Sequence, residues 1–418
     1  MSSQNSTQSI SPRQLATEAI HAGEHHNELG AHIAPIYQTS TFVFEDTEAI
    51  DAFHAGAANR YMYTRSKHPG RQALAAKLAA LEGYGLMQQA RAAGHAEQVV
   101  AAEVFSSGMA AISATLMGIA KAGQHIIAQD VLYGSSEHLI ADVLPQFGVT
   151  YSLVPGLDAE ALLREFAAHP NTVAVYLETP ANPTMTVIDI GEVGEVAHAH
   201  GAKVIVDNTF ATPILQRPLE LGADVVVHST TKYINGHGTV IGGAVISNDI
   251  ELLQSKIQPL IRFLGGVPSP FDCWLTSLGL KTLPLRMREH CANAMQVARF
   301  LADHPKVTAV YYPGLENSPH HALARQQMQG FGAMLSFEVK GGWQGAHQVL
   351  DSVQLCTLAV SLGNLDTLIE HPASMTHKIV PPEVRAQQGI TDGLMRLSVG
   401  LEDAGDIIAD LDQALARC

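Results

Sequence analysis

The sequence predicts an α/β fold with a mainly parallel central sheet and a smaller α+β domain at the C-terminus. From about residue 70, short and almost wholly apolar runs alternate with helix-like segments. Such strands are expected to be buried on both faces of a parallel sheet. After about residue 268 the alternation stops and prolines punctuate the chain. We therefore expect an N-terminal arm over 1–67, an α/β domain over 68–267 and an α+β domain over 268–418.

The expected elements follow in chain order. A helix is predicted over residues 71–82 from its composition and period, with Gly83 as its stop. Before Tyr61 the chain has no strong period and reads as an arm or extended segment. The other expected helices cover 109–122, 190–200 and 285–304. The expected strands cover 98–105, 125–128, 173–177, 203–206, 223–227, 309–312 and 334–338.

Composition excludes several classes of protein. The 418 residues are 46% hydrophobic and 16% charged, which is typical of a globular enzyme-sized chain. A formal charge of -15 argues against binding to nucleic acid or to an anionic membrane surface. The apolar stretches are too short to span a bilayer, and the Ser- and Gln-rich segment from Met1 to Ser11 does not read as a signal peptide.

Cysteine and histidine usage argues against a metal site. The four cysteines form no CxxC pair and no regular spacing, which fits a reducing cytoplasm. Of the 21 histidines, two adjacent pairs stand out, His25–His26 and His320–His321. Adjacent positions on a helix do not converge on one ion, so we expect solvated histidines and no metal.

The stretch over 223–238 carries the most informative polar residues. A buried strand is expected to end at His228, and Ser229, Thr230, Thr231 and Lys232 follow directly. Hydroxyl groups before a lysine at a strand end can hold a phosphate while the amine reaches a carbonyl carbon. An ordinary Ser/Thr turn with a solvated lysine explains this stretch alone equally well.

Two further stretches place polar groups at strand ends. Asp207 ends a buried strand and would point into the crevice where parallel α/β sheets bind ligands, although it could also cap a helix. Its spacing to Lys232 fits two successive strand ends, so both side chains would face one crevice. Residues 105–111 (FSSGMAA) predict a helix N-terminus whose N–H groups can bind an anion, or simply an ordinary strand-to-helix turn.

Together these stretches resemble the pyridoxal-phosphate (PLP) enzymes of cysteine and methionine metabolism, the trans-sulfuration enzymes. That group comprises cystathionine synthases and lyases, homoserine sulfhydrylases and methionine gamma-lyases. The resemblance runs from about Ala19 to the C-terminus. Its colinear motifs are YTR at 63–65, SSGMAA at 106–111, LYG at 132–134, ETPANP at 178–183, VDNTFATP at 206–213, HSTTKYINGHG at 228–238, HPASMTH at 371–377 and RLSVGLED at 396–403. It implies PLP as cofactor and the aspartate-aminotransferase-like fold, fold type I.

The resemblance also implies roles for matching residues. PLP acts as an electron sink at the substrate Cα. Lys232 matches the lysine that bonds to its aldehyde, and Asp207 matches the carboxylate that pairs with its pyridine nitrogen. Tyr133 matches a tyrosine that stacks on the ring and handles protons at the leaving group. The expected phosphate-binding residues are Gly108, Met109, Ser229 and Thr231, and Ser107 is expected to contact the cofactor as well. The expected substrate-binding residues are Arg396, Ser361 and Asn182.

Two more matches imply an oligomer. Tyr63 and Arg65 correspond to residues that reach the phosphate of a neighbouring subunit, and arginine offers the bidentate fork that phosphate prefers. A single chain would then carry an incomplete site. Family members are usually tetramers built from two dimers, so we expect a cytoplasmic homotetramer with shared sites and a small amino acid as substrate.

The segment before Ser361 separates the members of the family. Val360 stands where cystathionine lyases and synthases usually carry a glutamate that meets a distal ammonium, so the chain is most similar to methionine gamma-lyase. Ser135 and the pair Ile261–Arg262 depart from that pattern, and the link over 84–103 is longer than usual and should lengthen a helix or loop. The alternatives are an O-acetylhomoserine or O-succinylhomoserine sulfhydrylase and a cystathionine gamma-lyase or synthase. A PLP-binding protein without turnover or a nucleotide binder fits the intact site residues less well.

Overall fold

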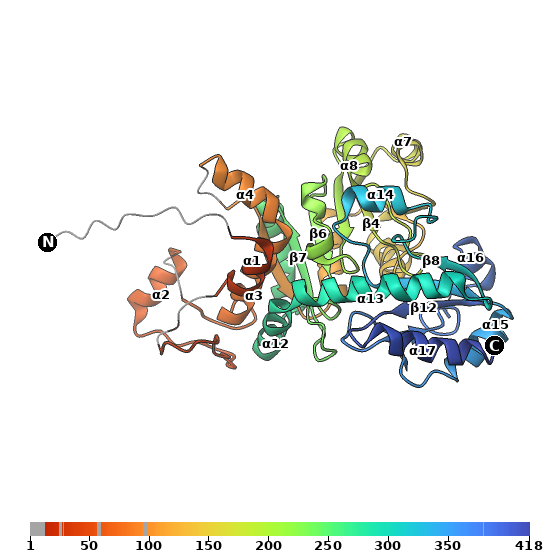
Figure 1. Cartoon of the computed structure of the whole chain (residues 1–418). Coiled ribbons are helices and arrows are strands. Elements are labelled where there is room, and N and C mark those ends of the chain that lie inside the picture. Colours follow the sequence, from red (N-terminus) through yellow and green to blue (C-terminus); the bar gives the residue numbers. More distant parts are fainter. Residues whose placement is uncertain (1–12, 25–26, 28, 57–59, 95–97, 379) are drawn as a thin grey trace.

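A computed structural model describes residues 13–24, 27, 29–56, 60–94, 98–378 and 380–418. The Met1–Ser11 segment and the His25–His26 pair lie outside these residues. The described chain forms two sheets with helices packed around them (Figure 1). The strands are β1 Ala101–Phe105, β2 His125–Gln129, β3 Thr150–Val154, β4 Thr172–Glu178, β5 Lys203–Asp207, β6 Val225–His228, β7 Gly243–Ser247, β8 Val307–Tyr311, β9 Met334–Val339, β10 Thr357–Leu358, β11 Leu368–Glu370 and β12 Leu394–Ser398.

The first sheet has seven strands in the order β1-β7-β6-β5-β4-β2-β3. The pairs β2–β3, β2–β4, β4–β5 and β5–β6 are parallel, and β7 runs antiparallel to both of its neighbours. The prediction of a mainly parallel α/β sheet is confirmed. Two strands of this sheet are not predicted by the sequence pattern: β7, whose direction breaks the βα alternation, and β3, an edge strand with exposed residues.

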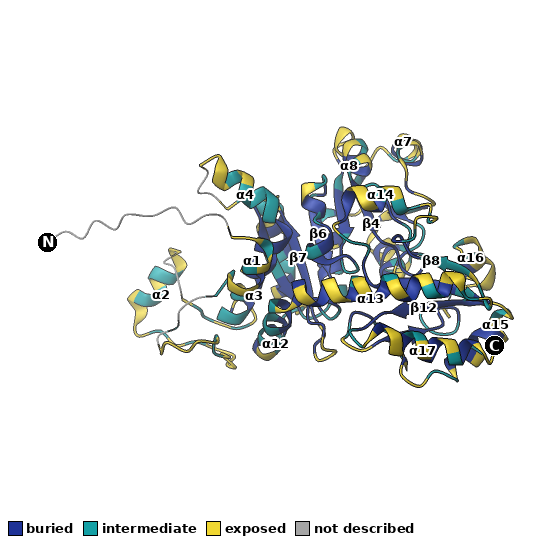
Figure 2. Ribbon diagram, viewed as in Figure 1, coloured by how far each residue is buried: buried dark blue, intermediate teal, exposed yellow. Residues whose placement is uncertain are grey.

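The inner strands of this sheet are almost wholly buried on both faces, as the apolar strand runs predicted, whereas the edge strand β3 is partly exposed (Figure 2). On β5, Ile205 belongs to one apolar cluster while Val204 and Val206 belong to another. The helices of this part of the chain are α3 Pro69–Glu82, α4 Tyr84–Ala92, α5 Gly108–Ile119, α6 Gly134–His138, α7 Ala159–Ala168, α8 Ile190–Ala199, α9 Thr212–Leu215, α10 Ile250–Leu252 and α11 Gln258–Leu264, with single turns at Leu139–Val143, Leu144–Phe147, Pro218–Glu220 and Leu253–Ile257. The segment 84–103, expected to lengthen a helix or loop, contains the helix α4.

The second sheet lies in the C-terminal part and has the order β10-β11-β12-β9-β8. The long helix α13 (Leu283–Asp303) runs from the region of the first sheet to the second (Figure 1). The remaining helices here are α12 Pro270–Lys281, α14 His321–Gln327, α15 Gly342–Leu350, α16 Pro382–Gln387 and α17 Ala404–Leu415. No helix among the described residues is both long and apolar enough to cross a membrane.

The N-terminal segment is more structured than predicted, because it contains two short helices. In α1 (Leu15–His21), Ala19 is fully buried against the body of the protein. α2 (Thr47–His54) begins at Asp46, whose carboxylate accepts a hydrogen bond from the backbone N–H of Ala49 at 2.8 Å. The stretch around α2 still extends away from the body as an arm (Figure 1).

Candidate active site

The carboxyl ends of the parallel strands bring the predicted residues together. Asp207 ends β5 and is the register partner of Glu178, which ends β4. Lys232 follows β6 by four residues, in the turn after His228. The spacing argument is therefore confirmed: Asp207 and the lysine turn lie at the ends of neighbouring strands, at the edge where parallel sheets bind ligands.

Lys232 meets the C-terminal domain at this edge. Its Nζ donates a hydrogen bond to Ser361 Oγ at 2.7 Å. Ser361 lies between β10 and β11 and has a φ of 89°, a left-handed conformation that is strained for a side chain other than glycine. Burial, assisted by the positive charge of Arg396, lowers the pKa of Lys232 to about 8. The amine is thus far more available as a nucleophile or base than an ordinary lysine.

Arg396 on β12 is almost fully buried and held from three sides. Its Nη1 donates to Asn182 Oδ1 at 2.8 Å and its Nη2 donates to the Ser361 carbonyl at 2.7 Å. Nη2 also lies 3.1 Å from Glu370 Oε2. Among the described residues, Arg396 Nε has no hydrogen-bond partner. The predicted substrate-binding trio therefore converges and leaves a guanidinium N–H free for a carboxylate.

Two glutamates at the site received no role from the sequence. Glu370 is the register partner of Arg396, and burial raises its pKa although Arg396 opposes the shift. Glu178 accepts the backbone N–H of Tyr133 with both carboxylate oxygens at 3.0 Å, and burial raises its pKa. Glu178 is the first residue of the ETPANP motif, and Glu370 directly precedes the HPASMTH motif. A motif alone does not show that a carboxylate holds another residue in place.

Tyr133 is fixed at its backbone and exposed at its side chain. The side chain is 45% exposed, although its backbone is fixed by Glu178. The phenol lies near enough to Arg396 to influence its ionisation. Tyr133 is therefore anchored at its backbone, and its hydroxyl has no hydrogen-bond partner among the described residues, as suits a residue that must contact a cofactor or substrate.

The start of α5 forms the expected anion cradle. Ser107 Oγ accepts the Ala110 N–H at 3.0 Å and so caps the helix, which leaves the N–H groups of Gly108 and Met109 without acceptors in the described chain. A Cβ on Gly108 would lie 2.9 Å from Ser229 Cβ, so only glycine lets the two segments approach this closely. The N–H groups and the Ser229 hydroxyl suit a phosphate at this point.

The remaining phosphate candidates are placed differently. The Thr231 hydroxyl donates to the Gly242 carbonyl at 3.2 Å and accepts the Gly242 N–H at 2.9 Å, so it is already engaged in this structure. Tyr63 and Arg65 lie exposed on the N-terminal segment, with the guanidinium 5.3 Å from the tyrosine ring. Within the described chain, no hydrogen bond or ion pair joins either residue to Lys232, Ser361 or Arg396, which we call the Lys232 cluster. Their assignment to a neighbouring subunit's site stays a prediction.

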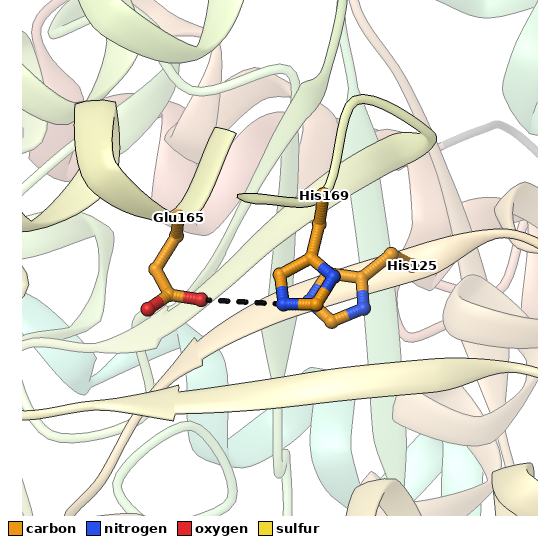
Figure 3. Close-up of side chains that lie close together, drawn as sticks. All are labelled: His125, Glu165 and His169. Carbon is orange, nitrogen blue, oxygen red and sulfur yellow. Dashed lines mark ion pairs between the residues drawn. The ribbon is translucent and has the colours of Figure 1, made fainter. Parts of the chain in front are cut away.

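A separate cluster of potential metal ligands lies where β2, which carries His125, meets α7, which carries Glu165 and is followed by His169. Nitrogen and oxygen atoms of His125, Glu165 and His169 lie within 4.8 Å of one another (Figure 3). The two imidazole rings, however, are stacked with centroids 3.9 Å apart and planes 7° apart. A metal ion must lie near the plane of each coordinating imidazole, and stacked planes share no such point. Both His125 ring nitrogens also contact hydroxyls, those of Thr150 and Ser152. This geometry favours a stacked pair over a metal site.

Comparisons with known proteins agree with this site. The family described as "Cys/Met metabolism PLP-dependent enzyme" matches residues 16–416. An L-methionine gamma-lyase of Porphyromonas gingivalis is 48% identical over 402 residues, covering 96% of each chain. A cystathionine gamma-synthase of Mycobacterium leprae is 44% identical over 402 residues, again covering 96% of each. The crystal structure of a cystathionine gamma-lyase from Lactobacillus plantarum, complexed with L-serine, superposes with a TM-score of 0.86 at 40% identity and covers 97% of this chain and 99% of that one.

Proposed function

Because the chain belongs to the family of Cys/Met metabolism PLP-dependent enzymes, we propose that it is a carbon–sulfur lyase acting on L-methionine. The products are methanethiol, ammonia and 2-oxobutanoate. Several curated relatives named L-methionine gamma-lyase, at 46–48% identity, support this choice. Membership of the family supports PLP as the cofactor. The choice of methionine as substrate rests on the residues next to the substrate-binding side chains.

The observation that carries the proposal is Val360. Its side chain is 52% exposed and it directly precedes Ser361, the residue that touches Lys232. An apolar side chain here suits the methylthio end of methionine and offers no partner to a second ammonium. The nearby carboxylate, that of Glu370, is already engaged by Arg396 and by the Thr376 hydroxyl. A substrate with a distal ammonium therefore finds no ion-pair partner at residue 360 and gains less from binding than it would beside a glutamate.

The chain's own residues divide the work of elimination. Bound PLP supplies an electron sink that acidifies the substrate Cα. Arg396, held by Asn182 and the Ser361 carbonyl, binds the substrate carboxylate and fixes the Cα proton in front of Lys232. The Lys232 amine, with its lowered pKa, would remove the proton at Cα, return that proton to another atom of the bound substrate–cofactor unit and, neutral again, remove the proton at Cβ.

The leaving group and the ring need two further residues. The Tyr133 phenol, which is 45% exposed, donates a proton to the departing sulfur. Asp207 pairs with the ring nitrogen of PLP. Its Oδ1 accepts the Thr209 N–H at 2.9 Å, and burial raises its pKa while Thr209 and His228 oppose the shift. Asp207 would hold a proton at the ring nitrogen, which would keep the bound group an effective electron sink.

We extend the proposal to assembly and location. Tyr63 and Arg65 are exposed on the N-terminal segment, which leaves them available to the phosphate of a second subunit. The active unit is then at least a dimer, and the family resemblance makes the assembly a tetramer. A net charge of -15 and reduced cysteines suit the cytoplasm. The boundaries at 67 and 267 divide the arm, the PLP-binding part and the C-terminal part.

A second function has a specific observation in its favour. Relatives named cystathionine gamma-synthase reach 44% identity over the same length, so γ-replacement on an O-acylhomoserine is the competing activity. Ser135 and Ile261–Arg262 also depart from the methionine gamma-lyase pattern.

The distal-ammonium argument is tested with Val360→Glu. The kcat/KM values of wild type and variant are measured on L-methionine and L-cystathionine with 2-oxobutanoate as the readout. We expect wild type to favour methionine by at least about tenfold, and the variant to lose most of that preference because its carboxylate pairs with the second ammonium. Val360→Leu is the matched control and should keep the preference. Wild-type preference for cystathionine contradicts the proposal.

A further inference from the structure

Glu82 occupies a position that is unfavourable for a carboxylate. It is the last residue of α3 and is fully buried. The C-terminal end of a helix carries partial negative charge, so a buried carboxylate there is destabilised by both the helix dipole and the loss of water. Such a residue needs compensating contacts, and it is retained at a cost to stability.

The compensating contacts reach the two strand ends of the active site. Glu82 Oε1 accepts a hydrogen bond from Asn208 Nδ2 at 2.8 Å and another from His228 Nε2 at 2.5 Å. His228 is also fully enclosed, with both side chains of the pair at 0% exposure. One oxygen atom of an α3 residue therefore ties the end of β5 to the end of β6.

Both partners of Glu82 are chain neighbours of residues that carry the proposed chemistry. Asn208 directly follows Asp207, and His228 directly precedes the turn that contains Ser229 and Lys232. Asn208 is held on its other side as well, since Nδ2 donates to the Gln216 carbonyl at 2.8 Å and Oδ1 accepts from Gln216 Nε2 at 3.1 Å. Residue 208 has little freedom to move while Glu82 holds it.

We propose that Glu82 is a positioning residue: through Asn208 and His228 it fixes the ends of β5 and β6, and so the placement of Asp207 and Lys232 around PLP. The inference rests on the proposed role of Asp207 at the ring nitrogen. What matters in this account is the position of the accepting oxygen. The Glu82 Oε2 atom has no hydrogen-bond partner among the described residues, so only one oxygen is needed.

Two conservative variants separate position from charge. Glu82→Gln keeps an oxygen in place for Asn208 and His228 and loses the charge. Glu82→Asp keeps the charge but withdraws the oxygens by about 1.5 Å, one C–C bond, which stretches both hydrogen bonds beyond useful length. The probe is PLP added to apoprotein. The readouts are its dissociation constant and the pH midpoint of the visible absorbance band of lysine-bound PLP.

We expect Glu82→Asp to weaken PLP binding by about tenfold or more and Glu82→Gln to stay within about threefold of wild type. In Glu82→Asp the midpoint of the visible band should move to higher pH, because a ring nitrogen that is less well paired with Asp207 carries less positive charge and repels the neighbouring proton less. The proposal is overturned if Glu82→Gln is the more impaired of the two, or if both variants match wild type in both readouts.

A matched control separates positioning from general stability. Asp410 is another buried carboxylate, in α17, whose oxygens accept the backbone N–H groups of Gln354, Leu355 and Cys356. Asp410→Ala should lower the melting temperature and leave both PLP readouts unchanged. If it changes them as Glu82→Asp does, the readouts follow stability alone and the proposal fails. Failure of the underlying site assignment looks different: Lys232→Ala would then still hold a reducible PLP adduct.

Discussion

Replacing Arg396 by lysine tests the substrate clamp most sharply. The guanidinium binds Asn182 Oδ1, the Ser361 carbonyl and Glu370 at the same time and still has Nε–H free among the described residues. A lysine ammonium keeps the charge and the ion pair with Glu370, but it cannot also present a two-pronged fork to a substrate carboxylate. Losing one or two charge-assisted hydrogen bonds costs about 2–4 kcal/mol, which corresponds to a fall of about 30- to 1,000-fold in kcat/KM.

The assay is steady-state formation of 2-oxobutanoate from L-methionine. Most of the loss should fall on KM, and the visible band of bound PLP should remain, since Arg396 holds substrate and not cofactor. Arg385→Lys is the control: Arg385 is also buried and donates to the Val380 carbonyl at 2.9 Å, but its ion-pair partner Asp392 lies outside the Lys232 cluster. A fall of less than about threefold for Arg396→Lys, or an equal fall for the control, would refute the clamp.

Three other predictions follow from the site. The rate at which apoprotein binds PLP covalently should rise with pH, with a midpoint near 8, because only the neutral Lys232 amine attacks the aldehyde. Stopped-flow absorbance measures this rate, and a midpoint near the pKa of free lysine contradicts the prediction. Tyr133→Phe should lose about 10²–10⁴-fold in elimination rate with PLP still bound, whereas a rate near wild type removes Tyr133 from proton transfer. Mixing inactive Arg65→Ala with inactive Lys232→Ala should restore some activity if Tyr63 and Arg65 serve a neighbouring site; none, with subunit exchange demonstrated, argues for unshared sites.

Strand ends are the part of the site that sequence predicts well. Buried parallel strands are recognisable as short apolar runs, and the polar residue that ends each run must face the ligand edge of the sheet. This pattern alone predicts that Asp207 and Lys232 lie at neighbouring strand ends, as they do. The antiparallel β7 is harder to predict because its apolar run follows a glycine-rich loop instead of a helix.

Residues that act by holding others are harder to predict. Glu178 lies 45 positions in sequence from Tyr133, whose N–H it accepts. Glu370 lies 26 positions from Arg396, and Glu82 lies 126 positions from Asn208, their respective contacts in space. Glu178 ends an apolar run, which predicts its place at the ligand edge but not its contact with Tyr133, and for Glu370 and Glu82 nothing in local composition distinguishes the carboxylate from one that faces water. Only tertiary packing shows that these three carboxylates are buried. Burial makes the loss of one of their hydrogen bonds or ion pairs costly in free energy.

The central claim is that this site performs γ-elimination on methionine, and one product analysis tests it most directly. Purified enzyme is incubated in parallel with L-methionine, L-cystathionine, L-homocysteine, and O-acetylhomoserine plus sulfide, and initial rates of every product are compared. The account predicts that methionine yields methanethiol, ammonia and 2-oxobutanoate in equal amounts and with a higher kcat/KM than cystathionine. Slow release of 2-oxobutanoate from methionine, together with rapid formation of homocysteine from O-acetylhomoserine and sulfide, would contradict it and identify a sulfhydrylase.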